Sequence, residues 1–371
     1  MKRLLKTALC AVLCLSLSLP VLSGCGSDPA PVSSEPEESS FLLPEPSSEP
    51  EPVSSEPEPE PEPEPAGPRN PLTGEADYPE SAVGRRPVAI MVNNIDAAVP
   101  HRGLSAADVI YEVVTEGGIT RMMAVFADLD AVPYTGPVRS VRHYYTDLAY
   151  PYDPIFVHFG GSKPGKAAVA DRGMDNVDGL VYGTTAFYKD QERANSRGVE
   201  HSYFINGEAI AQVCEKRGYS LEGDPIPPLE ISQTPISPVE KVSGVYVKFS
   251  GYSSDRFDYN AGTGLYEKQR KGQPHIDADT GEVLTFSNVL ILATDITSYD
   301  GGILREVALD SGRGWFLTGG GLEPITWAKG SYKNQFTFTL SDGAPAKGNV
   351  GPTFIAIIDE SMVESLAFDR E

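Results

Sequence analysis

The segment from Gly26 to Pro68 limits the fold most, because its composition cannot build a hydrophobic core. Among its 43 residues, 13 are proline and 12 are Asp or Glu, none is Lys or Arg, and Phe41 is the single aromatic residue. Repeated Glu-Pro units favour an extended polyproline conformation, which repulsion between carboxylates stretches further. We expect a disordered stalk here, so the folded part of the chain must follow it.

The residues before the stalk are typical of a lipoprotein signal peptide. Three basic residues lie within the first six positions, and positions 4–22 are almost entirely apolar. The run ends in Leu-Ser-Gly-Cys at 22–25, the pattern of a lipobox. We expect residues 1–24 to be removed and a lipid on Cys25 to hold the chain at the extracytoplasmic face of the cell membrane. The alternative, an uncleaved membrane anchor, calls for a longer apolar run.

In this interpretation residues 25–68 comprise the lipidated cysteine and the stalk. The stalk either carries the folded part through or above a cell wall, or is a spacer without a required length. Cysteine usage agrees with maturation, because Cys10 and Cys14 are removed and Cys25 takes the lipid. Cys214 then has no intramolecular partner, and its apolar helical surroundings favour a buried, unreactive thiol. We expect neither a disulfide nor a multi-cysteine metal site.

The charge balance excludes one class of partner. The formal net charge of −22 combines +3 from the signal peptide, −12 from the stalk and −13 from residues 69–371. Nucleic acid requires a basic surface, so we expect no nucleic-acid partner. The remaining ~300 residues are enough for two domains. We expect them at 69–224 and 239–371, joined by a proline-rich bridge at 225–238.

The first domain is predicted to be of the α/β type, with a mixed sheet and helices. Short apolar runs predict its strands, and Gly117-Gly118 between two of them predicts a hairpin. Strands are expected at 87–92, 109–114, 119–126 and 155–159, and helices at 140–149 and from 166 to 171. The second domain has short β-biased segments separated by turn residues, which predicts a smaller, mostly-β domain. Its strands are expected at 245–249, 265–268, 289–292, 315–318, 336–339 and 353–358. The fold class is therefore α+β.

A glycine loop follows the strand at 155–159 and nearly matches a phosphate-binding motif. It contains Gly160, Gly161, Ser162 and Lys166, but Ala167 stands where Ser or Thr would coordinate magnesium. We therefore expect no nucleotide hydrolysis and no cofactor. Glycine amides before a helix still favour an anion of another kind.

Arginines close to this loop are the strongest candidates for a ligand site. Arg139 and Arg142 lie in a local excess of basic residues, Arg121 lies on a predicted strand, and Arg193 lies in a polar segment. A planar guanidinium group binds two oxygens of a carboxylate or phosphate at once. The alternative is that each arginine pairs with a local carboxylate, such as Glu112, Glu116 or Asp128, and only stabilises the fold.

The histidines lack the spacing of a metal site. His158, between Val157 and Phe159 on a strand, is more typical of a hydrogen-bonded interior side chain. His201, beside Glu200, is the better candidate for ligand contact or proton transfer.

Several motifs in order resemble the YerB-like lipoproteins, a family of two-domain proteins of unknown function. The resemblance covers nearly all of residues 70–359 and implies a membrane-anchored lipoprotein with this architecture, but no reaction. The chain departs from the family at Lys189 and Ser202, where relatives tend to have Arg and Asn. The motifs are at 87–94, 103–112, 116–121, 136–142, 158–162, 312–320 and 325–329.

A fainter likeness to the LytR-CpsA-Psr family suggests a different function. The order of strand, arginine-bearing turn and strand ending in Gly-Gly is similar, and would assign Arg139, Arg142 and Gly160-Gly161 to a pyrophosphate. Three hypotheses therefore remain. The first is binding of an anionic cell-envelope ligand, the second is an envelope phosphotransferase or hydrolase, and the third is a scaffold for an envelope protein complex. Whether the chain is an enzyme stays open at this point.

Overall fold

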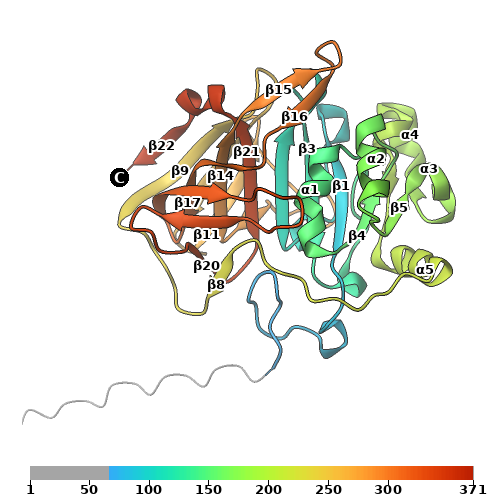
Figure 1. The fold of residues 1–371 in the computed structure, drawn as a ribbon, viewed down its shortest axis with the longest axis horizontal. Coiled ribbons are helices and arrows are strands. Elements are labelled where there is room, and N and C mark those ends of the chain that lie inside the picture. The colour runs from blue at the N-terminus through green and yellow to red at the C-terminus, as the bar shows by residue number, and fades with distance from the viewer. Residues whose placement is uncertain (1–66, 371) are drawn as a thin grey trace, which may run out of the picture. The chain divides into compact units, whose positions relative to one another are not determined.

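In the computed structural model, which describes residues 67–370, strands from both halves of the chain pair into one mixed sheet (Figure 1). The predicted signal peptide, Cys25 and the stalk up to residue 66 lie outside the described residues.

The first half, up to residue 224, contains the α-helices of the described part and seven strands. Its strands are β1 (Val88–Asn94), β2 (Val109–Val114), β3 (Thr120–Phe126), β4 (Ile155–His158), β5 (Asn176–Asp178), β6 (Tyr188–Lys189) and β7 (Tyr203–Phe204). Its helices are α1 (His143–Ala149), α2 (Lys163–Asp171), α3 (Gly179–Tyr182), α4 (Gln191–Arg197) and α5 (Gly207–Arg217).

The second half consists of strands with one short 3-10 helix near its end. The strands are β8 (Glu230–Ser232), β9 (Glu240–Lys248), β10 (Ser254–Asn260), β11 (Leu265–Arg270), β12 (Gln273–Pro274), β13 (Thr285–Phe286), β14 (Asn288–Thr294), β15 (Ile296–Tyr299), β16 (Leu304–Val307), β17 (Ser311–Thr318), β18 (Gly321–Ala328), β19 (Thr337–Leu340), β20 (Lys347–Asn349), β21 (Thr353–Asp359) and β22 (Ala367–Arg370).

Strand β21 joins the two halves. It lies between β14 and β2 and runs parallel to both, so the sheet continues from the second half into the first. The main path of the sheet follows the order β12-β11-β10-β9-β18-β17-β14-β21-β2-β3-β1-β4-β5. The two halves therefore share a sheet although the first contains α-helices and the second consists mainly of strands.

The central strands are buried on both faces. All seven residues of β1 are buried, and its five apolar residues alternate between two hydrophobic clusters, with Ile90 in one and Met91 in the other. Such continuous apolar runs are typical of strands covered on both sides. Figure 1 shows α2 to α5 grouped around β1, β4 and β5, away from the strands of the second half. The helices thus bury the sheet near the predicted ligand site.

The predicted fold class is confirmed. Helices and a mixed sheet form the first part, and strands dominate the second. The hairpin predicted at Gly117-Gly118 joins β2 to β3, where Gly117 has a φ of 65°. The helix expected at 140–149 begins at His143, and the one expected from residue 166 begins at Lys163 with Ser162 as its cap. Strand β8 lies inside the predicted bridge and pairs with β20, so the bridge is part of the fold.

Cys214 lies on α5 and is buried, as expected. Burial raises the pKa of its thiol to about 11, so the thiol stays protonated and unreactive at neutral pH. Within residues 67–370 no helix has the length and apolar character that crossing a membrane requires.

Candidate functional site

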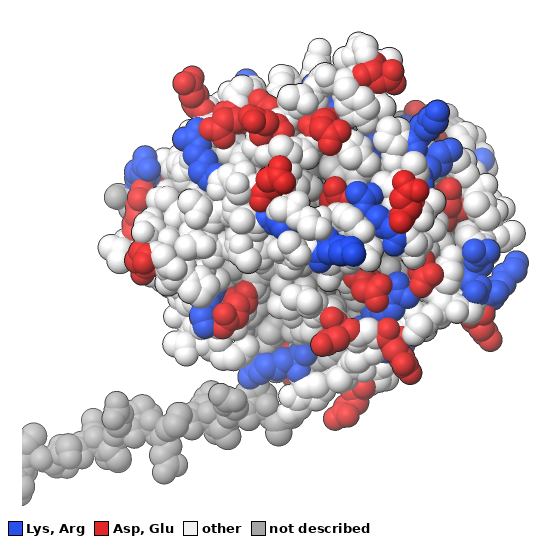
Figure 2. All heavy atoms as spheres, in the orientation of Figure 1, with Lys and Arg blue, Asp and Glu red and all other residues white. Residues whose placement is uncertain are grey.

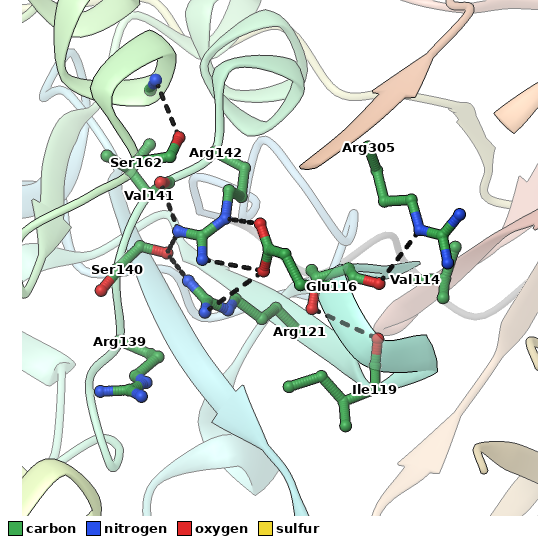
Figure 3. Close-up of polar contacts among 12 residues, drawn as sticks. Val114, Glu116, Ile119, Arg121, Arg139, Ser140, Val141, Arg142, Ser162 and Arg305 are labelled. Carbon is green, nitrogen blue, oxygen red and sulfur yellow. Dashed lines mark hydrogen bonds and ion pairs between the residues drawn. The ribbon is translucent and has the colours of Figure 1, made fainter. Parts of the chain in front are cut away.

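Three of the predicted arginines gather on the first half of the chain, and we call Arg121, Arg139 and Arg142 the arginine cluster. Arg121 lies near the start of β3, and Arg142 immediately precedes α1. Both donate hydrogen bonds to the carbonyl oxygen of Ser140 (Figure 3). Arg139 is close enough for its charge to act on Arg121 and for the charge of Arg142 to act on it.

The backbone around Arg139 is fixed by the sheet. Its amide donates to the carbonyl of Met91 on β1, and its carbonyl accepts from the amide of Phe159 after β4. The segment 136–142 therefore lies beside β1, just past the end of β4. The arginine side chains are therefore carried by backbone that has little freedom to move.

Two carboxylates face these three guanidinium groups. Glu116 accepts a forked pair of hydrogen bonds from Arg142, one of them at 2.8 Å, and lies 3.9 Å from Arg121 (Figure 3). Glu200 lies 3.8 Å from Arg139, and its side chain is exposed. Each of these arginines was alternatively expected to pair with its own local carboxylate. This is not the case, because Arg121 and Arg142 share Glu116. Counted over residues 67–370, the group keeps one excess positive charge.

Burial makes this excess costly. The buried Nε of Arg121 has no hydrogen-bond partner among the described residues. Burial, reinforced by the charge of Arg142, holds the pKa of Arg121 well below its ordinary value, and burial lowers the pKa of Arg139 as well. Burial alone would raise the pKa of Glu116, but the hydrogen bond and charge of Arg142 outweigh it and lower that pKa. An added anion would relieve the positive excess.

A cleft opens beside the arginine cluster. It has a volume of about 360 Å³ and lies between the segment that bears Arg139, the end of β4 and the segment before β7. Its lining includes Arg139, Ser140, Gly160, Gly161, Glu200 and Tyr203. On the face shown in Figure 2, acidic and basic side chains are intermixed without a large area of one sign. The positive excess is thus a local property of the site.

The glycine loop uses its amides inside the fold. The amide of Gly160 donates to Asp178 at 2.7 Å, and that of Ser162 donates to the carbonyl of Val141 at 3.2 Å. The amide of Gly165 donates to the side chain of Ser162. A Cβ on Gly161 would lie 2.6 Å from the side chain of Val141, so this glycine permits close packing. The loop shapes the cleft, but these amides are not free to hold a phosphate.

His158 and Lys166 lie apart from the arginine cluster. Both line another cleft, of about 410 Å³, together with Asp178 and Arg217. His158 is buried, and its Nδ1 donates to the carbonyl of Gly160 at 2.9 Å. Burial lowers its pKa, which favours a neutral ring. The structure therefore does not bring these two residues together with the arginines.

Arg193 binds backbone and not an open site. Its guanidinium donates to the carbonyls of Ala98 at 2.6 Å, Pro100 at 3.0 Å and His201 at 3.1 Å. It therefore ties two segments, at 98–100 and at His201, to α4. His201 is buried, accepts a hydrogen bond from Asn93 at 2.7 Å if Nδ1 is unprotonated, and has Nε2 3.6 Å from Glu200. It reaches the cleft only through that glutamate.

Sequence reasoning missed a second group of charges, inside the sheet. Lys268, Glu112 and Asp255, which we call the buried ionic cluster, are almost inaccessible to solvent. Lys268 shares a face of β11 with the buried Tyr266, and this spacing of two was the available signal. Over residues 67–370, no three His, Cys, Asp or Glu side chains are placed to hold a metal ion.

Comparison with known proteins identifies the family. Residues 72–220 match the N-terminal domain, and residues 245–355 the C-terminal domain, of the DUF3048 proteins of unknown function. A protein described as a lipoprotein, YerB of Bacillus subtilis (strain 168), is 28% identical over 302 residues, which cover 80% of this chain and 88% of that protein. The crystal structure of YerB from Bacillus subtilis matches with a TM-score of 0.71 and 26% identity, covering 81% of this chain and 99% of that one. The chain therefore belongs to the YerB-like family of two-domain proteins.

Proposed function

We propose that this chain is a lipoprotein held by a lipid on Cys25 at the extracytoplasmic face of the membrane, where its arginine cluster binds an anionic cell-envelope ligand. The lipobox at 22–25 and the relative described as a lipoprotein support the anchor. The ligand group is a phosphate or a carboxylate, because a guanidinium fork matches the oxygens of both.

The observation that carries this proposal is the excess of guanidinium groups over carboxylates in the arginine cluster, whose Arg139 lines the neighbouring cleft while Arg121 and Arg142 lie behind it. Arg139 lines the cleft, and its Glu200 partner is exposed at 3.8 Å, too far for a hydrogen bond. A ligand oxygen can therefore replace Glu200 at Arg139 at little cost. Glu116 sits between Arg121 and Arg142 as a carboxylate ligand would, so the cluster already accommodates an anion of this shape.

Binding of the full chain to purified cell-wall polymer tests the proposal. The double variant Arg139→Ala plus Arg142→Ala should bind at least about tenfold more weakly, because a lost hydrogen bond to a charged group costs about 1.5–3 kcal/mol. Wild-type binding should also weaken as salt is added, since exposed charges are screened. Sedimentation with wall fragments at several salt concentrations measures both effects.

The matched control removes two arginines elsewhere. Arg313 and Arg370 form exposed ion pairs on the second half, so Arg313→Ala plus Arg370→Ala changes the net charge equally without touching the cleft. This control should bind like the wild type. Equal binding by both double variants, or binding indifferent to salt, would reject the arginine cluster as the ligand site.

A further inference from the structure

The buried ionic cluster brings an amine and a carboxyl group into contact inside the sheet. Lys268 on β11 and Asp255 on the neighbouring strand β10 have Nζ and Oδ2 2.6 Å apart. Glu112 on β2 has Oε2 3.6 Å from the same Nζ. A nitrogen at this distance from a carboxyl oxygen lies within ~4 Å of the carboxyl carbon, close to the range of a near-attack geometry.

The surroundings of the cluster are apolar. Nζ of Lys268 lies 5.8 Å from the ring centre of Phe257 and 5.2 Å from that of Phe354, and both rings are buried. Two carboxylates and one ammonium group would leave a net buried negative charge, which is costly. Burial, increased by the proximity of Glu112, raises the pKa of Asp255 well above its usual range. Both effects favour the neutral carboxylic acid form of Asp255 beside the amine of Lys268.

Two hydrogen-bonded histidines, His101 and His275, provide an acceptor for one N–H of the Lys268 amine. Nε2 of His101 lies 2.7 Å from the carbonyl oxygen of Asn93, which can only accept, so His101 carries its proton there. Its Nδ1 then accepts from Nε2 of His275 at 2.8 Å. Nδ1 of His275 is left as an acceptor, 3.2 Å from Nζ of Lys268. This assignment requires both rings to be neutral, and burial lowers the pKa of each.

The two carboxyl oxygens of Glu112 have different surroundings. Its Oε1 accepts hydrogen bonds from Asn94 at 2.8 Å and Thr120 at 2.6 Å. Its Oε2 has no hydrogen-bond partner among the described residues and faces Nζ of Lys268. One oxygen thus anchors the carboxyl group while the other remains available to the reacting pair.

We propose that Lys268 and Asp255 condense into an intramolecular isopeptide bond, with Glu112 carrying the protons. The ammonium of Lys268 gives a proton to the Glu112 carboxylate, and the free amine attacks Cγ of the Asp255 acid. The new N–C bond forms, and the C–O bond to the hydroxyl group breaks. The hydroxyl leaves with a second proton from nitrogen, passed through Glu112, as one water molecule. The products are a neutral amide, water and a protonated Glu112.

This outcome removes every charge from the cluster. The ammonium and the carboxylate are replaced by an amide and a carboxylic acid, so the cost of keeping ions away from water disappears. The remaining amide N–H keeps His275 as its acceptor, and the Glu112 hydroxyl becomes a donor for the amide oxygen. Exclusion of water from the apolar surroundings disfavours hydrolysis of the bond. The crosslink would tie β10 to β11 covalently.

Intact mass of the denatured full chain tests the bond. The wild type should be lighter than the Lys268→Met variant by the substitution difference and one further water molecule, with the lipid cancelling between them. Glu112→Gln, which keeps the shape but cannot pass protons, should regain the lost water while circular dichroism stays native. A wild-type mass that differs from Lys268→Met by the substitution alone would overturn the proposal without relying on how any variant folds.

Lys329 supplies the matched control. It is also buried, but its Nζ donates to backbone carbonyls such as those of Ser331 and Asn334. Lys329→Met should keep the missing water, because the hydrogen-bond partners of that amine among the described residues are backbone carbonyls and not carboxyl groups. Recovery of the water in Lys329→Met would also overturn the assignment to Lys268. Retention of the mass loss in a folded Glu112→Gln would overturn the proton-carrying role of Glu112.

Discussion

Replacing Lys268 with alanine should lower the free energy of unfolding by about 3–5 kcal/mol, the usual cost of removing one partner from a buried ion pair. The change leaves Glu112 and Asp255 facing each other in an apolar interior without their cation. The estimate applies to the ion pair, and a covalent bond between Lys268 and Asp255 would add the loss of a crosslink to it. Urea unfolding followed by circular dichroism measures it.

The exposed Lys271 provides the control. It pairs with Asp96 at the surface, so Lys271→Ala should cost at most about 1 kcal/mol. Acid should also reduce the cost of Lys268→Ala, because protonation removes the negative charge that the lysine leaves behind. A cost near that of Lys271→Ala at neutral pH would mean that the buried ionic cluster contributes little to stability.

The parts of the fold that were predictable depend on local sequence. Strands β1, β2 and β3 are short apolar runs, and Gly117-Gly118 between two of them permits the tight connection. Strand β18 was not predicted, because Pro324 lacks an amide donor and argues against a strand. The position of β21 between β14 and β2 was not predictable either, because an apolar run does not specify which neighbours it pairs with.

In the candidate site, too, the features set by local sequence were predictable and those set by the packing of distant segments were not. Arg139 and Arg142 are close in sequence, so their proximity followed from spacing, and β3 brings Arg121 to them. The exposed Glu200 opposite Arg139 and the separate cleft that holds Lys166 depend on how distant segments pack. The spacing of the glycine loop resembles that of a phosphate-binding motif, but it did not predict the role of the loop. Glycines of this loop also allow Val141 to pack closely.

The meeting of the three side chains of the buried ionic cluster was not predictable from the sequence for a further reason. A lysine in a strand of alternating polarity is usually solvated, and its burial depends on strands from elsewhere in the chain. Lys268 on β11 meets Glu112 on β2 although six strands lie between β11 and β2 along the main path of the sheet. Charged residues that are distant in sequence give no local sign that they will share an interior.

The second large effect expected is a dependence of stability on His101 and His275 in acid. Burial lowers the pKa of His101 to about 3 and that of His275 well below its ordinary value. The unfolded chain takes up these protons near pH 6.5, whereas the folded chain does not, so the unfolded state binds more protons below that pH. Each histidine should therefore destabilise the fold by about 1.4 kcal/mol per pH unit as pH falls from about 6.5 to 4.5.

A comparison with His101→Gln plus His275→Gln isolates this effect, because other groups titrate with the opposite sign. Wherever Asp255 keeps a free carboxyl group, burial raises its pKa, so the folded chain keeps that proton and gains stability relative to the unfolded chain in acid. The free energy of unfolding of the wild type, followed against pH, contains both contributions. The difference in this free energy between the wild type and the double variant contains mainly the contribution of the histidines. The wild type should be clearly more stable at pH 7.5, and its advantage should shrink by several kcal/mol by pH 4.5. An advantage that stays constant across this range would mean that the two rings are not held neutral in the fold, and the proton positions assigned along the chain from Asn93 to Lys268 would be wrong.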